Sequence, residues 1–199
     1  MILSLLVAQA SAVEAERAFA RMAAEQGQWT AFRTFAAEGA TMFAPGPVDA
    51  HAFLAPLTDP PQAIRWSPSE SYVSCDGSTA ANTGPWSDPK GGHGFFSTIW
   101  TNRTGQWRWT VDGGDTLATP RPAVPEPKVE RASCVKAPYP SPPPIPAGWK
   151  GSGGASRDRS LVWLWRVAPD LSRTFTVRLW DGNRYRLVID DKIAAPATP

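Results

Sequence analysis

Residues 91–115, GGHGFFSTIWTNRTGQWRWTVDGGD, decide the fold class of this chain. The segment indicates two strands joined at residues 104–105, because a glycine-containing pair between two apolar runs is typical of a hairpin turn. In the second strand, Trp107, Trp109 and Val111 alternate with polar residues. Strand side chains alternate between the two faces of a sheet, so we expect these three to share one face.

The first strand of this hairpin is apolar on both faces. Phe95 and Ile99 lie on one face, and Phe96 and Trp100 lie on the other. A strand of this kind is covered on both sides, so we expect it in the centre of its sheet.

The composition is that of a globular protein. The chain has 199 residues, which suits one full domain with an appendage or two small units. Its net charge is +2, so we expect no nucleic-acid partner. The ten tryptophans lie mainly on strand-like segments, where core and cross-strand packing is their ordinary role.

The start of the chain resembles a secretory signal. Residues 2–8 are an apolar run, followed by Ala10-Ser11-Ala12, which resembles a cleavage site. No Lys or Arg precedes the run, which departs from the usual pattern, and the alternative is a plain start to the first helix. We expect a signal peptide over residues 1–12, a periplasmic or secreted mature protein, and no integral membrane segment in it.

The two cysteines, Cys75 and Cys134, leave two possibilities open: a disulfide bond, as expected in an oxidising compartment, or two free thiols. The sequence has no Cys-x-x-Cys pair, and His51 and His93 are its only histidines. We therefore expect no metal site.

Helices precede strands in the first half of the chain. Asp49 is placed to cap the third helix. Runs of helix-forming residues followed by a meander of strands indicate an α+β fold, with helices on one face of a curved antiparallel sheet. The predicted helices span residues 13–25, 28–37 and 50–57, and the predicted strands span residues 41–44, 63–75, 78–86, 93–102 and 106–115.

The second half contains a linker and a smaller sheet. Residues 117–158 are rich in Pro, Gly and Ser, which indicates an extended linker. Residues 159–193 then alternate as a three-stranded β-meander. So little sheet cannot bury a core alone, so we expect its apolar face to dock on the first domain. The apolar side chains expected on that face are Phe175, Val177, Leu179, Tyr185, Leu187 and Ile189, with Arg166, Arg178 and Arg186 on the opposite face, either solvated or as an anion site.

The order of elements resembles the nuclear transport factor 2-like superfamily, which includes ketosteroid isomerase, scytalone dehydratase and polyketide cyclases. The resemblance rests on residues 35–47, FAAEGATMFAPGP, on Gly84-Pro85-Trp86 and on the strand that ends in Ile99-Trp100. It covers residues 13–116 and is closest to exported bacterial members. It implies a cone-shaped barrel with a pocket for a small apolar ligand.

The catalytic residues of ketosteroid isomerase do not carry over. The position that matches its general base, before the proline that follows the first strand, is Ala44. The position that matches its tyrosine on the first helix is Ala20. Enolisation needs a proton acceptor and a stabiliser of the developing charge, so the usual isomerase chemistry is not expected.

The resemblance also implies which residues form the pocket. His93 is the one candidate catalytic residue, because histidine titrates near neutral pH and this one begins a central strand. Glu70 and Asp112 are strand carboxylates that could assist it. The candidate wall residues, chosen because they lie on the elements that form the cone, are Trp29, Phe43, Trp66, Trp86 and Trp100.

Three functions follow as hypotheses. The first is a non-catalytic module of the cell envelope that binds a small apolar ligand. The second is a lyase or hydrolase that uses His93 with a pocket carboxylate. The third is a structural homodimer that pairs through the outer face of the sheet. The sequence has no phosphate-binding loop and no nucleophile elbow, so no cofactor is expected.

Overall fold

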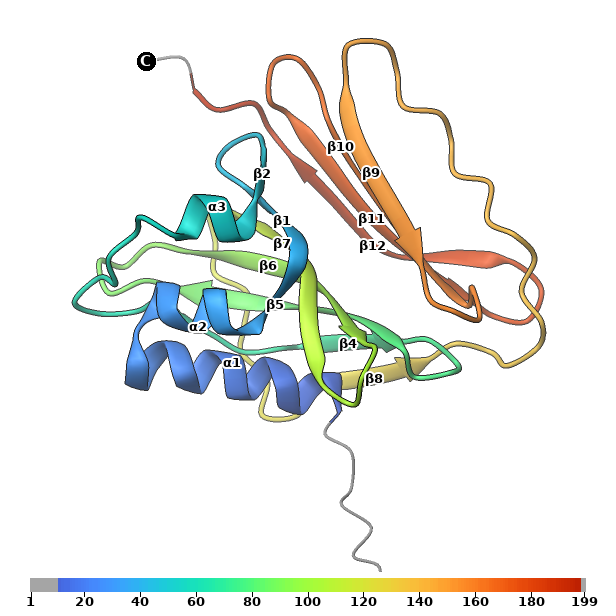
Figure 1. The fold of residues 1–199 in the computed structure, drawn as a ribbon, viewed down its shortest axis with the longest axis horizontal. Coiled ribbons are helices and arrows are strands. Elements are labelled where there is room, and N and C mark those ends of the chain that lie inside the picture. Colours follow the sequence, from blue (N-terminus) through green and yellow to red (C-terminus); the bar gives the residue numbers. More distant parts are fainter. Residues whose placement is uncertain (1–10, 198–199) are drawn as a thin grey trace, which may run out of the picture.

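Three helices, a large sheet and a smaller sheet make up the chain (Figure 1). The computed structural model describes residues 11–197, so most of the predicted signal peptide lies outside the described residues. The helices are α1 (Ala12–Gln26), α2 (Gln28–Phe35) and α3 (Ala50–Leu54). Within residues 11–197, none of these helices combines the length and the apolar character needed to cross a membrane.

The large sheet has the strand order β2-β1-β7-β6-β5-β4-β8, with β3 paired to β5. Neighbouring strands are antiparallel except for β1 with β7 and β4 with β8, which are parallel. Its strands are β1 (Ala36–Phe43), β2 (Pro47–Asp49), β3 (Arg65–Trp66), β4 (Glu70–Val73), β5 (Thr79–Ser87), β6 (His93–Asn102), β7 (Trp107–Thr116) and β8 (Lys128–Arg131).

The smaller sheet is antiparallel throughout, with the order β12-β11-β10-β9. It has four strands where the sequence predicts three. Its strands are β9 (Lys150–Ala155), β10 (Leu161–Val167), β11 (Arg173–Trp180) and β12 (Tyr185–Ile193).

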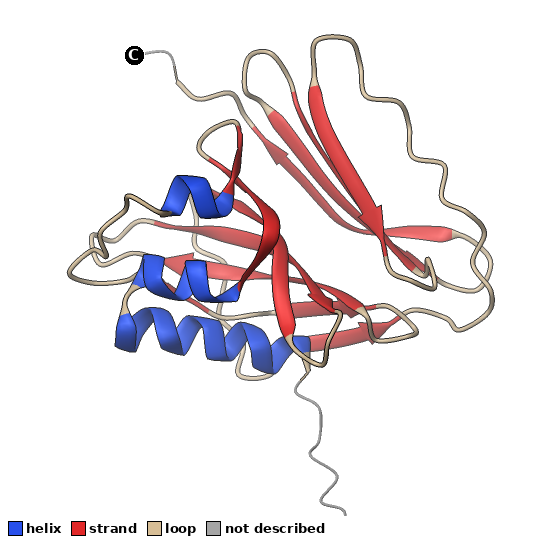
Figure 2. Cartoon of the chain, viewed as in Figure 1, coloured by secondary structure: helices blue, strands red, loops and turns tan. Residues whose placement is uncertain are grey.

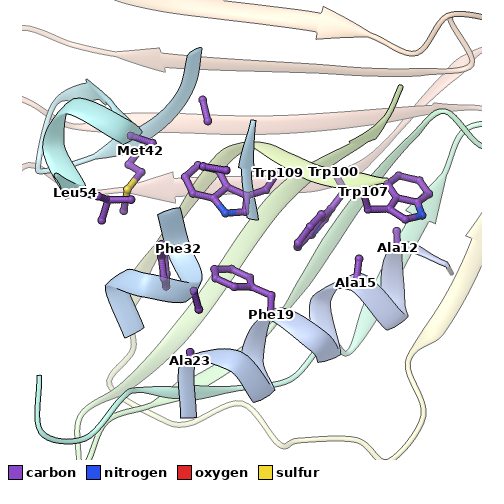
Figure 3. Close-up of a cluster of buried hydrophobic side chains, with 14 of the residues drawn as sticks. Ala12, Ala15, Phe19, Ala23, Phe32, Met42, Leu54, Trp100, Trp107 and Trp109 are labelled. Carbon is purple, nitrogen blue, oxygen red and sulfur yellow. The ribbon is translucent and has the colours of Figure 1, made fainter. Parts of the chain in front are cut away.

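The large sheet is covered on both faces. Figure 2 shows the helices gathered on one side of it, and Figure 3 shows their apolar side chains meeting Trp100, Trp107 and Trp109 from the sheet. On the other face, Ile99 and Val111 pack in one cluster with apolar side chains of the smaller sheet. The central strand β6 is buried along most of its length, as its two apolar faces predict.

One prediction about the hairpin is wrong. Trp109 and Val111 do not share a face, because Trp109 belongs to the cluster under the helices and Val111 to the cluster under the smaller sheet. The pairing shifts between Ile99 opposite Val111 and Trp100 opposite Trp109. A β-bulge at this point places one extra residue, Thr110, in β7 and reverses the alternation beyond it.

A second bulge, in the smaller sheet, changes which side chains of β12 share a face. The register shifts between Val177 opposite Ile189 and Arg178 opposite Leu187, so β12 holds one extra residue. Ile189 is therefore buried at 5% exposure, while Leu187 is 43% exposed on the outer face. The expectation that Tyr185, Leu187 and Ile189 share one apolar face is wrong for this reason.

Two segments of the predicted linker are strands. β8 pairs in parallel with β4 and extends the large sheet, and β9 pairs with β10 in the smaller sheet. Proline and glycine dominate the local composition there, but backbone pairing to an existing strand edge overrides it. Earlier in the chain, β1 replaces the end of the second predicted helix, and the strand predicted over 63–75 divides into β3 and β4.

Two turns of the same sequence pattern join the sheets. Residues 74–78 and 156–160 both have the pattern Ser-x-Asp-x-Ser. In each turn the aspartate accepts hydrogen bonds from both serines of its own pattern. The turns also bond to each other: the Cys75 amide donates to Ser160 Oγ at 2.8 Å, and the Asp76 amide donates to Asp158 Oδ2 at 2.9 Å.

A disulfide bond lies beside these turns. Cys75 and Cys134 are bonded, with a Cα–Cα distance of 5.2 Å. This bond answers the question that the sequence leaves open between a disulfide and free thiols. It ties the turn before β5 to the segment that follows β8.

Candidate functional site

A cavity of about 320 Å³ lies between the helices and the large sheet. This size is at the lower end of the range for small-molecule sites. Its wall is mainly aromatic, with a few polar groups. The lining residues are Phe19, Gln28, Trp29, Phe32, Met42, Phe43, Ile64, Trp66, Trp86, Phe95, Phe96, residues 112–116 and Arg173.

Four of the five wall residues proposed from the sequence lie around this cavity: Trp29, Phe43, Trp66 and Trp86. The fifth, Trp100, is not among the lining residues. It is fully buried, at 0% exposure, beneath the helices. Four of the predicted residues thus share one cavity, and Trp100 lies in the layer behind it; their role in binding a ligand stays a prediction.

Hydrogen bonds hold two of the indoles in place. Trp86 Nε1 donates to the Phe95 carbonyl at 3.0 Å, and Trp66 Nε1 donates to Glu16 Oε1 at 2.9 Å. A side chain fixed in this way loses little freedom when a ligand binds, so the cavity is largely preformed.

Trp29 is positioned through the start of α2. Gly27 occupies the N-cap with φ of 117° and has no side chain to cap the helix. The carboxylate of Asp59 supplies the cap instead, accepting from the amides of Trp29 and Thr30 and from the Thr30 hydroxyl. A Cβ on Gly27 would lie 2.4 Å from this carboxylate, so a glycine is needed there.

Glu16 is fully buried on α1, and all of its hydrogen-bond partners are N–H donors. Trp100 Nε1 donates to Oε2 at 2.6 Å, Asn82 Nδ2 donates to the same oxygen at 3.2 Å, and Trp66 Nε1 donates to Oε1. Burial raises the pKa of Glu16 from 4.5 to about 7, against the lowering effect of these donors. Three donors and no acceptor suit the ionised form of this carboxyl group.

Asp112 is the second carboxyl group of the cone, and it lines the cavity directly. Its Oδ2 accepts a hydrogen bond of 2.7 Å from Thr98 Oγ1. Burial raises its pKa from 3.8 to about 7, and the charge of Glu16 adds to this rise. The bulge in β7 is what turns Asp112 inward, because it moves Val111 to the opposite face.

The rim of the cavity carries a cation that two carboxylates attract. The guanidinium of Arg173 lies 5.0 Å from the centre of the Phe43 ring and donates to the Gly114 carbonyl. Asp115 and Asp191 both attract this guanidinium. Among the described residues, no Lys, Arg or His side chain makes a hydrogen bond or an ion pair with Glu16 or Asp112, which lie deeper in the cone.

The histidines and the remaining strand carboxylate lie away from the cavity. His93 is not among the lining residues, and its Nδ1 lies 3.3 Å from the Gly91 carbonyl oxygen. His51 is exposed on α3, which Asp49 caps by accepting from the Ala52 amide. Glu70 accepts a hydrogen bond from the Tyr72 hydroxyl. The cavity carboxylate is thus not paired with His93.

The sequence contains one indication that Glu16 is buried, and it comes from the position of this residue and not from its type. On α1, Ala12, Phe19 and Ala23 form a buried apolar stripe, and Glu16 lies within it at helical spacing. A carboxylate in such a stripe must be buried, and a buried carboxylate needs partners.

Within residues 11–197, no group of three or more His, Cys, Asp or Glu side chains could hold a metal ion.

No protein-family model and no curated protein sequence matches this chain. Among solved structures, the chain is similar to a protein from Novosphingobium aromaticivorans that carries the name of an aromatic ring hydroxylase. The two share 13% identity and a TM-score of 0.38, over 53% of this chain and 85% of that one. A protein from Exiguobacterium sibiricum that carries the name of a Ca/calmodulin-dependent kinase II association domain shares 17% identity and a TM-score of 0.37, over 55% of this chain and 97% of that one.

Proposed function

We propose that this protein binds a small, mainly apolar molecule in the cavity between its helices and its large sheet. The observation that carries this proposal is the aromatic wall around a cavity of about 320 Å³. Clefts of this kind, with few polar groups among aromatic ones, are the usual sites for small ligands. The fixed indoles of Trp66 and Trp86 support a site that exists before the ligand arrives.

The domain organisation forms part of this proposal. Residues 13–116 would be a nuclear transport factor 2-like domain, residues 117–158 its linker, and residues 159–193 the docked meander. The order of helices and strands and the cone-like cavity support this assignment. The disulfide between Cys75 and Cys134 supports an oxidising compartment, and with it a role in the cell envelope or outside the cell.

The two other hypotheses are less well supported. A lyase or hydrolase that combines His93 with a pocket carboxylate lacks the necessary contact, since His93 does not line the cavity. A homodimer through the outer face of the large sheet would need a free face. That face packs against the smaller sheet through Ile99 and Val111.

Nuclear magnetic resonance of the tryptophan indoles tests the binding proposal. We expect a neutral probe, 2-naphthalenemethanol, to shift the indole N–H signals of Trp29, Trp66 and Trp86, which line the cavity. The indole of Trp180, in the smaller sheet and outside the lining of this cavity, serves as an internal control.

A pair of matched variants makes this test specific. Ile64→Trp places a larger side chain in the cavity wall and should abolish the shifts. Leu187→Trp makes a similar change on the exposed face of β12 and should leave them intact. Shifts that are equal at all indoles, or that survive Ile64→Trp in a folded protein, would reject the cavity as the binding site.

A further inference from the structure

We propose that the ligand of this cavity is a compact amine, with an aromatic or alicyclic body and a protonated amino group that pairs with Asp112. This inference rests on the proposed function and names the chemical class of its ligand. It follows from three features of the site: the position of a carboxylate, the balance of charge around it, and the nature of the walls.

The first feature is the position of the carboxylate. Asp112 lines the cavity, and its Oδ2 accepts a hydrogen bond from the Thr98 hydroxyl. Aromatic side chains, Phe43 and Phe96 among them, line the same cavity. Asp112 is therefore a polar group that a ligand with an apolar body can reach inside this cavity.

The second feature is the balance of charge. Glu16, from α1, adds a further buried carboxylate whose influence reaches Asp112. Arg173, from β11, is the cation among the lining residues, and Asp115 and Asp191 already attract it. Two carboxylates without a neighbouring cation favour a ligand that supplies positive charge, because an unpaired buried charge is costly.

The third feature is the nature of the walls. Trp29, Trp66 and Trp86 line the cavity together with several phenylalanines. The faces of aromatic rings attract ammonium groups, and tryptophan does so most strongly. The same rings also cover an apolar body. An anionic ligand would meet Asp112 and Glu16 with the wrong sign, and a neutral ligand would leave their charge unbalanced.

The experiment compares three probes of one shape by calorimetry at pH 8: 2-phenylethylamine, 2-phenylethanol and 3-phenylpropanoate. We expect the amine to bind at least tenfold more tightly than the alcohol, and the carboxylate to bind most weakly. Asp112→Asn should remove the preference for the amine and leave the affinity of the alcohol within about threefold. Asp190→Asn, which removes an exposed carboxylate paired with Lys192 on β12, is the matched control and should change neither affinity.

A measurement on the unmodified protein guards against a variant that fails to fold. Binding of an ammonium requires the ionised form of Asp112, so the affinity of the amine should rise between pH 5 and pH 8, while that of the alcohol should not. The charge of Glu16 acts on Asp112, and the charged residues Arg173 and Asp115 line the same cavity.

The outcomes separate this inference from the proposed function. If the alcohol binds as tightly as the amine, the cavity binds apolar molecules but the inference about amines is wrong. A preference that persists in Asp112→Asn also overturns it, because the ammonium then binds elsewhere. If none of the three probes binds, both the inference and the support for an apolar site of this size fail.

Discussion

Two carboxyl groups in one cone, Glu16 fully buried and Asp112 partly buried, make the stability of this protein depend on pH. Burial raises the pKa of Asp112 from 3.8 to about 7, so the folded state keeps a proton that the unfolded state loses. The unfolding free energy must then fall as pH rises from about 4 to about 7. The stabilisation that comes from protonated Asp112 is complete below the pKa of Asp112 in the unfolded chain. It is lost as pH rises through the pKa of Asp112 in the folded protein. Glu16 shifts in the same direction.

Amide substitutions at these two residues should have opposite effects. Asp112→Asn removes a buried charge and keeps an acceptor for Thr98, so we expect it to raise the unfolding free energy by about 1–3 kcal/mol at pH 8 and to have little effect at pH 4. Glu16→Gln turns an NH₂ group toward one of its N–H donors, and should cost about 1–3 kcal/mol. Urea unfolding at pH 4, 6 and 8 measures both.

A loss of stability in Asp112→Asn would contradict this prediction. If this variant is less stable than the wild type at pH 8, then Asp112 is stabilised as a carboxylate and the direction given for its pKa is wrong. If Glu16→Gln is neutral at every pH, its three donors do not hold Trp66 and Trp100 in place.

The residues of the site differ in how well the sequence predicts them. The wall tryptophans follow from their elements, because a strand or helix at the cone presents them to the cavity. Glu16 does not follow from its residue type, because a glutamate on a helix is ordinarily solvated. Its place in the apolar stripe of α1 was the available signal. The sequence identifies Asp112 as a strand carboxylate. Simple alternation, however, places it on the face opposite to Trp109, whereas the structure places it in the cavity wall.

At the scale of elements, strand alternation predicts the sheets well until a bulge interrupts it. The bounds of β6 agree with the predicted strand 93–102, and β10 lies within the predicted meander 159–193. The faces of β7 and β12 are wrong beyond their bulges, because a period of two carries no mark of an extra residue. β8 is not predicted because its partner, β4, is distant in the sequence, and β9 is not predicted because its glycine-rich sequence indicates a linker although it pairs with the next strand, β10.

The paired turns at 74–78 and 156–160 should contribute more than ordinary turns. Asp158 accepts from the Asp76 amide across the two sheets as well as from Ser156 and Ser160 of its own turn. Asp170 accepts from Ser172 alone. We expect Asp158→Ala to lower the unfolding free energy by about 1–2 kcal/mol more than Asp170→Ala does, since it leaves an additional amide unpaired.

Thermal and urea unfolding of the two variants under the same conditions make this comparison. Equal losses would mean that the bond between the turns adds nothing, and that the apolar cluster holds the sheets together without it. The same comparison in reduced protein separates the turn from the disulfide beside it.

At the scale of the whole molecule, the two sheets pack against each other, and a disulfide bond ties the large sheet to the segment that leads to the smaller one. Apolar residues of both sheets share a buried cluster, and Cys75 is bonded to Cys134, 59 residues further along the chain. Closing a loop of about this length stabilises a fold by about 4 kcal/mol through the entropy of the unfolded chain. The apolar face of the smaller sheet obtains its cover in this packing, which its own size could not supply.

The first helix predicts where export would cleave the chain. The Ser11 hydroxyl accepts from the Glu14 amide, and the Ala12 carbonyl accepts from Asn82 Nδ2 at 3.0 Å. Cleavage before Val13 would remove both groups, whereas cleavage after Ala10 keeps them. We expect mass spectrometry of protein from its native host to find Ser11 as the first residue. An intact Met1 would contradict export, and a start at Val13 would contradict the role of these two contacts.

The bulge in β7 has a consequence for comparing this chain with others. Whether position 112 faces the cavity or the neighbouring sheet is decided by a count of residues, and Thr110 is the one that sets the count. In a homologue that lacks one residue here, an aspartate with identical neighbours would point away from any ligand. An alignment that misplaces a single gap here would therefore assign a cavity carboxylate to a residue whose side chain points away from the cavity.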